Sequence, residues 1–128
     1  NIIFKNRSEN YFRKLENTIS LRELKKRKTV ISLGGGAFLN KAIRKAVKDS
    51  SVSFWLDISI NELAKRLNKT KKRPLLFKKN LKETISKIYL ERKNTYSQAD
   101  YRIKCNSLNQ ETIVNKILEL YENSRNKI

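Results

Sequence analysis

All the glycines of this chain stand together, because Gly34, Gly35 and Gly36 follow directly on the apolar segment Thr29–Leu33. Glycine adopts backbone conformations closed to other residues, positive φ among them, and lets another molecule approach the main chain. The segment before the triplet is apolar and β-branched, which predicts a buried strand. The pattern therefore predicts a ligand-binding turn at the carboxyl end of a strand in an open α/β sheet.

Strand and helix patterns alternate along the rest of the chain. Further strands are predicted at 52–58 and 101–105, and helices after Ser8, Asn40 and Ser59, over 81–98 and over 111–122. The alternation predicts an α/β fold in which a three-layer parallel sheet carries helices on both faces. Three strands are few for this architecture, so we expect the first strands of the domain to be missing from this sequence.

Positive charge dominates the composition, with 30 Lys and Arg against 12 Asp and Glu and a net charge of +18. Such an excess is compatible with a basic nucleic-acid-binding module or an anionic membrane surface, and also with a solvated lysine-rich surface. The basic residues are spread along the chain, and the aromatic residues fall mostly at positions with a buried pattern. Both features favour the solvated surface, so we expect no specific nucleic-acid partner. No apolar run is long enough to cross a membrane.

The single cysteine, Cys105, has no partner for an internal disulfide, and its apolar surroundings predict a small core residue. A chain without disulfides fits the reducing cytoplasm, which is the expected location. The sequence has no histidine. Without a cluster of cysteine and histidine ligands, no zinc site is predicted.

Four arginines stand out by their context, and their planar guanidinium groups suit carboxylates and phosphates. They are Arg13, Arg66, Arg73 and Arg92. Each one alone is compatible with a solvated side chain, whereas several converging on the glycine turn would form an anion site. Glu16 lies three residues after Arg13 on the same helical face. It forms either a weak pair within the helix or a carboxylate that holds the arginine for a ligand.

The segment 68–80 is polar and basic around the apolar residues Pro74–Phe77, which include the only proline. Two interpretations fit this composition. The segment is either a surface loop or a lid that brings a cation over a phosphate and excludes water.

Four short strings together resemble one enzyme family. They are F-R-x-x-E at 12–16, V-I-x-L-G-G-G-A at 30–37, R-x-x-x-x-x-x-R-P-L-L at 66–76 and E-R-x-x-x-Y-x-x-A-D at 91–100. Each string is weak alone, but their order and spacing resemble the shikimate kinase family over nearly the whole chain. The resemblance implies a single domain over 1–128 with the fold of a P-loop kinase of the nucleoside-monophosphate-kinase type.

The resemblance implies a function and a substrate site. Family members transfer the γ-phosphoryl group of ATP to the 3-hydroxyl of shikimate, in the biosynthesis of chorismate and the aromatic amino acids. By this likeness Arg13 and Arg92 would bind the shikimate carboxylate, and Glu16 would hold Arg13 in place. The turn Gly34–Gly36 would present backbone to the shikimate hydroxyls. Shikimate and ATP are thus the expected partners of a protein that we expect to be a monomer.

The resemblance also implies a nucleotide site, to which Arg73 would contribute the lid arginine that reaches the transferring phosphoryl group. Arg66 would lie against the adenine. ATP and Mg²⁺ are the expected cofactors, and phosphoryl transfer depends on positioning and positive charge more than on covalent chemistry.

Two departures from the family pattern are visible in the sequence. The phosphate loop G-x-x-x-x-G-K-[ST] is absent, as is the early strand with its aspartate, and we expect both upstream of Asn1 together with the Mg²⁺ ligands. The chain as given is therefore expected to be marginally folded and inactive alone. The second departure follows Arg92, where the family's R-x-P-L-Y lacks its proline although Arg92 and Tyr96 are present.

Two other functions compete with this interpretation. The first is another small-molecule P-loop kinase, such as one that acts on a sugar acid, which the combination of the F-R-x-x-E and G-G-G strings disfavours. The second is a basic nucleic-acid-binding module, which would bind generic DNA in a salt-sensitive manner more strongly than it responds to shikimate.

Overall fold

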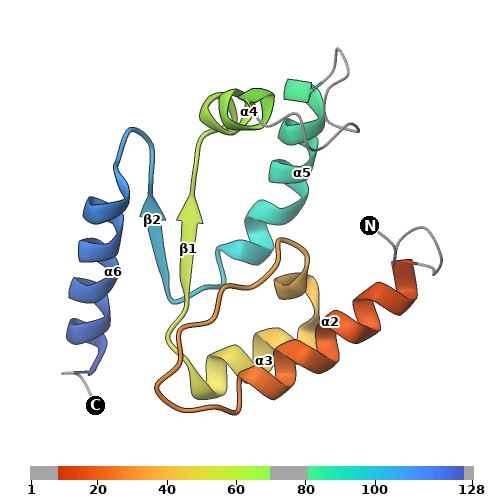
Figure 1. The fold of residues 1–128 in the computed structure, drawn as a ribbon, viewed down its shortest axis with the longest axis vertical. Helices are drawn as coiled ribbons and strands as arrows, with labels where there is room; N and C mark the ends of the chain where they lie inside the picture. The colour runs from red at the N-terminus through yellow and green to blue at the C-terminus, as the bar shows by residue number, and fades with distance from the viewer. Residues whose placement is uncertain (1–8, 70–80, 126–128) are drawn as a thin grey trace. The chain divides into compact units, whose positions relative to one another are not determined.

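The computed structural model of the chain describes residues 9–69 and 81–125. The chain divides into two compact units, an N-terminal unit (Asn1–Ser53) and a C-terminal unit (Phe54–Ile128). Figure 1 shows the elements in chain order, which are α2 (Glu9–Glu23), the 3₁₀ turn η1 (Ala37–Leu39), α3 (Lys41–Ser50), β1 (Phe54–Asp57), α4 (Ile60–Lys69), α5 (Leu81–Tyr96), β2 (Tyr101–Lys104) and α6 (Gln110–Arg125). Helices and strands alternate here much as the sequence predicts.

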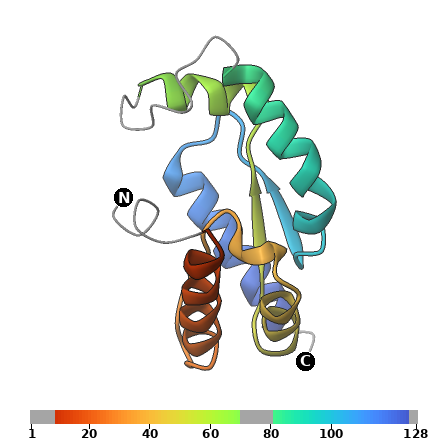
Figure 2. The same cartoon turned by 90° about the vertical axis from the view of Figure 1, so that its right-hand side faces the viewer.

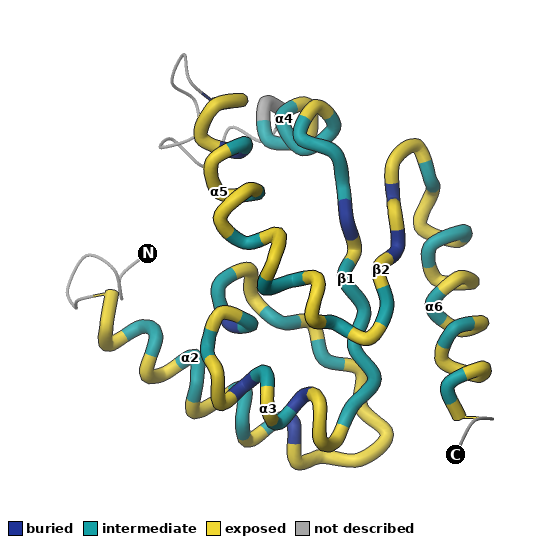
Figure 3. The backbone as a smooth tube through the Cα atoms, turned by 180° about the vertical axis from the view of Figure 1, so that it is seen from behind, coloured by how far each residue is buried: buried dark blue, intermediate teal, exposed yellow. Residues whose placement is uncertain are grey.

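The core of the N-terminal unit lies between the end of α2, η1 and α3. Its buried residues are Leu24, Ala37, Ile43 and Val47. Ile43 is fully enclosed, and it lies four residues before Val47 on one face of α3, so the buried stripe of this helix has the expected helical spacing. Figure 3 shows these buried stretches in dark blue on α3. The core therefore fixes α2 and the turn after it against α3.

The start of α3 confirms the predicted cap. Asn40 adopts an extended conformation, and its Oδ1 accepts a hydrogen bond of 3.0 Å from the backbone N–H of Ile43. An asparagine in this position satisfies one of the N–H groups that the first helical turn leaves without a partner. Ser59 has the same role before α4, where its hydroxyl accepts from the N–H of Glu62 at 3.3 Å.

The predicted strand Thr29–Leu33 is wrong, because the structure gives this segment no secondary structure. The side chains still alternate as a strand would, since Val30 is fully exposed whereas Ile31 and Leu33 pack on the core of the N-terminal unit. A strand is defined by hydrogen bonds to a neighbour, and no described residue forms a ladder with this segment. The apolar alternation is thus present, but a partner strand is lacking.

The C-terminal unit is built on two parallel strands. β1 and β2 pair in the register Phe54↔Tyr101 to Asp57↔Lys104, and helices α5 and α6 lie on opposite sides of the pair (Figure 2). This helix–sheet–helix layering agrees with the predicted α/β parallel architecture. Both strands are shorter than predicted, and the described residues contain two strands rather than three. Cys105, directly after β2, is 1% exposed, which confirms it as a core residue.

Within the described residues, no helix is both long and apolar enough to span a bilayer.

Asn40→Ala tests the cap of α3. The substitution removes the acceptor of the Ile43 N–H, so we expect the free energy of unfolding to fall by about 1 kcal/mol. Urea denaturation followed by circular dichroism measures the change. Asn115→Ala, at an exposed position inside α6, is the matched control and should not destabilise, because alanine is the better helix former. An equal loss in both variants would show that the cap contributes nothing.

Candidate functional site

In the N-terminal unit, Arg13 is held by an ion pair on α2. Its Nη1 donates to Glu16 Oε1 at 2.8 Å, and its Nη2 lies 3.8 Å from Glu9 Oε1. The Glu16 side chain is only 16% exposed, against 69% for Glu9. The Arg13–Glu16 pair is therefore partly shielded from water, where a charge-assisted hydrogen bond holds the guanidinium more firmly than a solvated helix pair does.

The glycine turn lies directly against this ion pair. A Cβ atom at Gly34 would come within 2.8 Å of Glu16 Oε2, and one at Gly36 would come within 2.8 Å of both Cζ and Nη2 of Arg13. Carbon atoms do not approach so closely, so any side chain at either position displaces the carboxylate or the guanidinium. The structure thus brings together four of the predicted site residues, Arg13, Glu16, Gly34 and Gly36.

The turn does not use the positive φ that its glycines allow. No glycine of the described chain has a positive φ, and Gly36 has φ −96° and ψ −10°, which any residue can adopt. Glycine at 34 and 36 instead leaves space for the ends of the Glu16 and Arg13 side chains, which a Cβ atom would make move. The turn ends in η1, where the N–H of Ala37 donates to the carbonyl of Gly34 at 3.0 Å.

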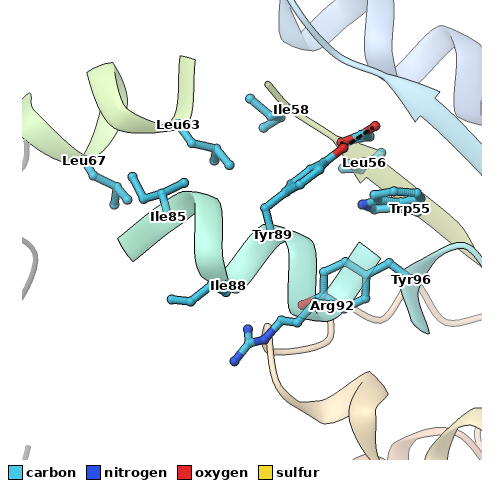
Figure 4. Close-up of a pocket in the computed structure, with 11 residues that line it drawn as sticks. Trp55, Leu56, Ile58, Leu63, Leu67, Ile85, Ile88, Tyr89, Arg92 and Tyr96 are labelled. Carbon is cyan, nitrogen blue, oxygen red and sulfur yellow. Dashed lines mark hydrogen bonds between the residues drawn. The ribbon is translucent and has the colours of Figure 1, made fainter. Parts of the chain in front are cut away.

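The C-terminal unit contains a pocket of 370 Å³ lined by β1, α4 and α5. Most of its wall is apolar, with Leu63 and Leu67 on one side and the aromatic rings of Trp55, Tyr89 and Tyr96 on the other (Figure 4). An apolar pocket with few polar groups is typical of small-molecule sites.

Arg92 is the cationic residue of this pocket wall. It is half-buried on α5, and no residue in the described ranges offers its guanidinium a hydrogen bond or an ion pair. Figure 4 shows the guanidinium turned away from the ring of Tyr89. A guanidinium without an internal partner is available to a carboxylate or phosphate.

A network of polar groups around one buried carboxylate lies beside this pocket, and it was not predicted from the sequence. Asp57, at the end of β1, is 6% exposed and accepts hydrogen bonds from Arg102 Nε at 2.8 Å and from the Tyr89 hydroxyl at 3.0 Å. The guanidinium carbon of Arg102 lies 4.8 Å from the ring centre of Trp55. The one available signal was an acid at the end of an apolar strand, which needs a cation when it is buried.

Burial and charge shift two pKa values in this network. The pKa of Tyr89 is raised, first by burial and then by its hydrogen bond to the Asp57 carboxylate, since both disfavour the phenolate. The pKa of Arg102 is raised as well, mainly by its hydrogen bond to Asp57. The neutral phenol and the charged guanidinium are therefore the forms that the folded chain favours.

Of the two further predicted site residues, Arg66 belongs neither to the group around Arg13 and the glycine turn nor to the pocket that contains Arg92. Arg66 lies on α4 with its Nη2 3.3 Å from Glu62 Oε1, and its side chain is 51% exposed. Arg73 and the expected lid beyond residue 69 lie outside the described residues. Arg13 and its neighbours belong to the N-terminal unit, whereas Arg92 belongs to the C-terminal unit.

A Mg²⁺ site does not fit the residues at hand. Across 9–69 and 81–125, no three His, Cys, Asp or Glu side chains gather where they could hold a metal ion. The buried Asp57 carboxylate is already engaged by Arg102 and Tyr89.

Residues 1–122 match the model of the shikimate kinase family. This chain belongs to that family. The order and spacing of the four strings in the sequence agree with this membership. The arginines and glycines described above are those that the resemblance assigns to the shikimate site.

Sequence relatives agree with the family assignment. The chain is 36% identical over 116 residues to the shikimate kinase of Bartonella henselae. The alignment covers 91% of this chain and 55% of that protein. The chain thus spans little more than half the length of this relative. A shikimate kinase of Persephonella marina is 37% identical over 116 residues, which make up 91% of this chain and 70% of that protein.

A solved structure gives the family fold. The shikimate kinase from Acinetobacter baumannii in complex with shikimate superposes with a TM-score of 0.85 at 25% identity, covering 95% of this chain and 69% of that one. Shikimate kinases have a P-loop NTPase-like α/β fold, so the predicted fold class is confirmed.

The raised pKa of Tyr89 predicts a pH dependence. The neutral phenol favours the folded state, so its contribution to stability is complete below the ordinary tyrosine pKa of about 10 and is lost as pH rises through the higher folded-state pKa. We expect the free energy of unfolding to fall more steeply above about pH 10 in the wild type than in Tyr89→Phe. Urea melts at a series of pH values measure both slopes. Parallel curves for the two proteins would contradict the assigned shift.

Proposed function

We propose that this chain binds shikimate and supplies the acceptor-recognition part of a shikimate kinase, which transfers the γ-phosphoryl group of ATP to the shikimate 3-hydroxyl. The observation that carries the proposal is the Arg13–Glu16 ion pair, whose charged ends lie close against the glycine turn at Gly34 and Gly36. Membership of the family supports it, as does the Acinetobacter relative, whose structure is a complex with shikimate.

The N-terminal unit would contribute a carboxylate-binding fork and a backbone surface. Glu16 orients Arg13 and neutralises part of its charge, so a ligand carboxylate would meet a guanidinium whose direction is already set. The turn Gly34–Gly36 presents bare backbone beside it, where N–H and C=O groups can reach the hydroxyls of a small ring. Gly34 and Gly35 are exposed and Gly36 is half-buried, so such a ligand can reach all three.

The C-terminal unit would contribute a second fork, which the family resemblance assigns to the same carboxylate. Arg92 has no partner in the described chain, so its guanidinium is available to a carboxylate.

The nucleotide side of the reaction rests on the family resemblance. Arg66 would lie against the adenine of ATP, and Arg73 would reach the transferring phosphoryl group. The sequence contains no G-x-x-x-x-G-K-[ST] string, and the described residues offer no Mg²⁺ ligand group. We therefore assign no step to Mg²⁺ on this chain and expect the 128 residues alone to bind shikimate without phosphorylating it.

Substitution of the two arginines tests the acceptor site. Loss of a hydrogen bond to a charged group costs about 1.5–3 kcal/mol, so Arg13→Ala and Arg92→Ala should each raise the Kd for shikimate about 10- to 150-fold. Isothermal titration calorimetry measures the Kd. Lys14→Ala and Lys93→Ala remove an exposed charge one residue away on the same helices and should change the Kd less than twofold, about the size of a screened surface effect. Equal effects of all four substitutions would mean that general charge, and not these two forks, attracts the ligand.

A coupled assay for ADP release tests whether the chain binds shikimate without transferring a phosphoryl group to it. With ATP, Mg²⁺ and shikimate present, the 128-residue chain should bind shikimate and release no ADP above background. Sustained shikimate-dependent ADP release would contradict the need for a phosphate loop.

A gluconate titration and a salt-dependent DNA titration test the two competing functions, and tighter binding of either ligand than of shikimate would favour that alternative.

A further inference from the structure

Helix α5 is attached to strand β1 at two points that flank Arg92. Three residues before Arg92, the Tyr89 hydroxyl donates to Asp57 Oδ1 at 3.0 Å. Four residues after it, the ring of Tyr96 lies 6.0 Å from that of Trp55, centre to centre. Residues three and four apart lie on neighbouring positions of one helix face, so a rotation of α5 that breaks these contacts carries Arg92 with it.

The acceptor for Tyr89 is itself held by several contacts. Asp57 is buried, its carboxylate is held by Arg102 from β2, and its carbonyl accepts from the N–H of Cys105 at 2.8 Å. Arg102 is in turn seated over Trp55. A buried carboxylate keeps its partners because separation would leave a charge without solvation. The Tyr89 hydrogen bond therefore ties α5 to a rigid point of the sheet.

We propose that Asp57, Tyr89 and Arg102 are positioning residues, which fix the rotation of α5 and so set the direction in which the Arg92 guanidinium leaves the helix. The proposal rests on the proposed function, in which Arg92 binds the carboxylate of shikimate. Arg92 has no partner of its own in the described residues, so the helix alone sets where its side chain starts and in which direction. A helix whose rotation is fixed in advance needs no reorientation when the ligand binds, which lowers the cost of binding.

Tyr89→Phe is the first test, because it removes one hydroxyl and keeps the ring. We expect the Nε–Hε NMR signal of Arg92 to shift or broaden without any ligand. The Kd for shikimate should rise about tenfold, which is the factor that corresponds to 1.4 kcal/mol at 25 °C. The fluorescence of Trp55, the only tryptophan of the chain and part of the same pocket, follows the titration. The midpoint of thermal unfolding should move by only a few degrees, about the effect of one lost hydrogen bond.

Tyr101→Phe is the matched control. It removes the same hydroxyl from a ring that stacks on Phe54 at 5.5 Å. That hydroxyl has no contact with Asp57, so the Arg92 signal and the shikimate Kd should stay at their wild-type values. Equal effects in both variants would reduce the result to a general loss of stability and overturn the proposal.

The Arg92 signal separates this proposal from the proposed function. If the signal is unchanged in a folded Tyr89→Phe variant, the positioning role is wrong whatever shikimate does. If the signal moves but the wild-type chain does not respond to shikimate, the positioning role stands and the proposed ligand is wrong. Should Tyr89→Phe fail to fold, Arg102→Lys tests the same link, since it keeps the charge beside Asp57 and removes the planar fork. An unchanged Arg92 signal in that variant overturns the proposal equally.

Discussion

The buried carboxylate of Asp57 is the constraint on which the C-terminal unit depends. An unpaired charge in that position would destabilise the fold by several kcal/mol, so β2 must bring Arg102 to it and α5 must bring Tyr89. The two strands are only four residues long, and a parallel pair of that length is weak by itself. Side-chain charge thus fixes a register and a helix position that backbone hydrogen bonds alone would define poorly.

In the N-terminal unit, the guanidinium of Arg13 is held close to the backbone of the glycine turn. Glu16 keeps Arg13 in place, and glycines at 34 and 36 leave room for both side chains. The core beneath, with Ile43 fully enclosed, keeps the turn and α2 at the separation that this arrangement needs. The core residues and the site residues therefore lie on the same or adjoining elements, although they are different residues.

The sequence predicted what is determined locally. The cap of α3 by Asn40, the start of α4 after Ser59 and the helix that carries Arg92 all follow from neighbours within a few residues. The prediction failed at Thr29–Leu33, because a strand needs a partner that the described chain does not provide. The contact between Asp57 and Arg102 was also missed, since these residues are 45 positions apart and have no shared periodic pattern. The glycine triplet was identified from its uniqueness, while the steric reason for it required the positions of Arg13 and Glu16.

The close packing of the glycine turn has a consequence for substitutions. A Cβ atom at Gly34 would meet the carboxylate of Glu16 and one at Gly36 the guanidinium of Arg13, so a replacement at either position makes the end of that side chain move. Gly35 differs, because a Cβ atom there would meet no neighbouring atom of the described residues within 4 Å. A replacement at Gly34 or Gly36 therefore acts on the Arg13–Glu16 pair first, whereas a replacement at Gly35 does not. Gly34 and Gly36 thus form the crowded part of the turn, and Gly35 forms the open part.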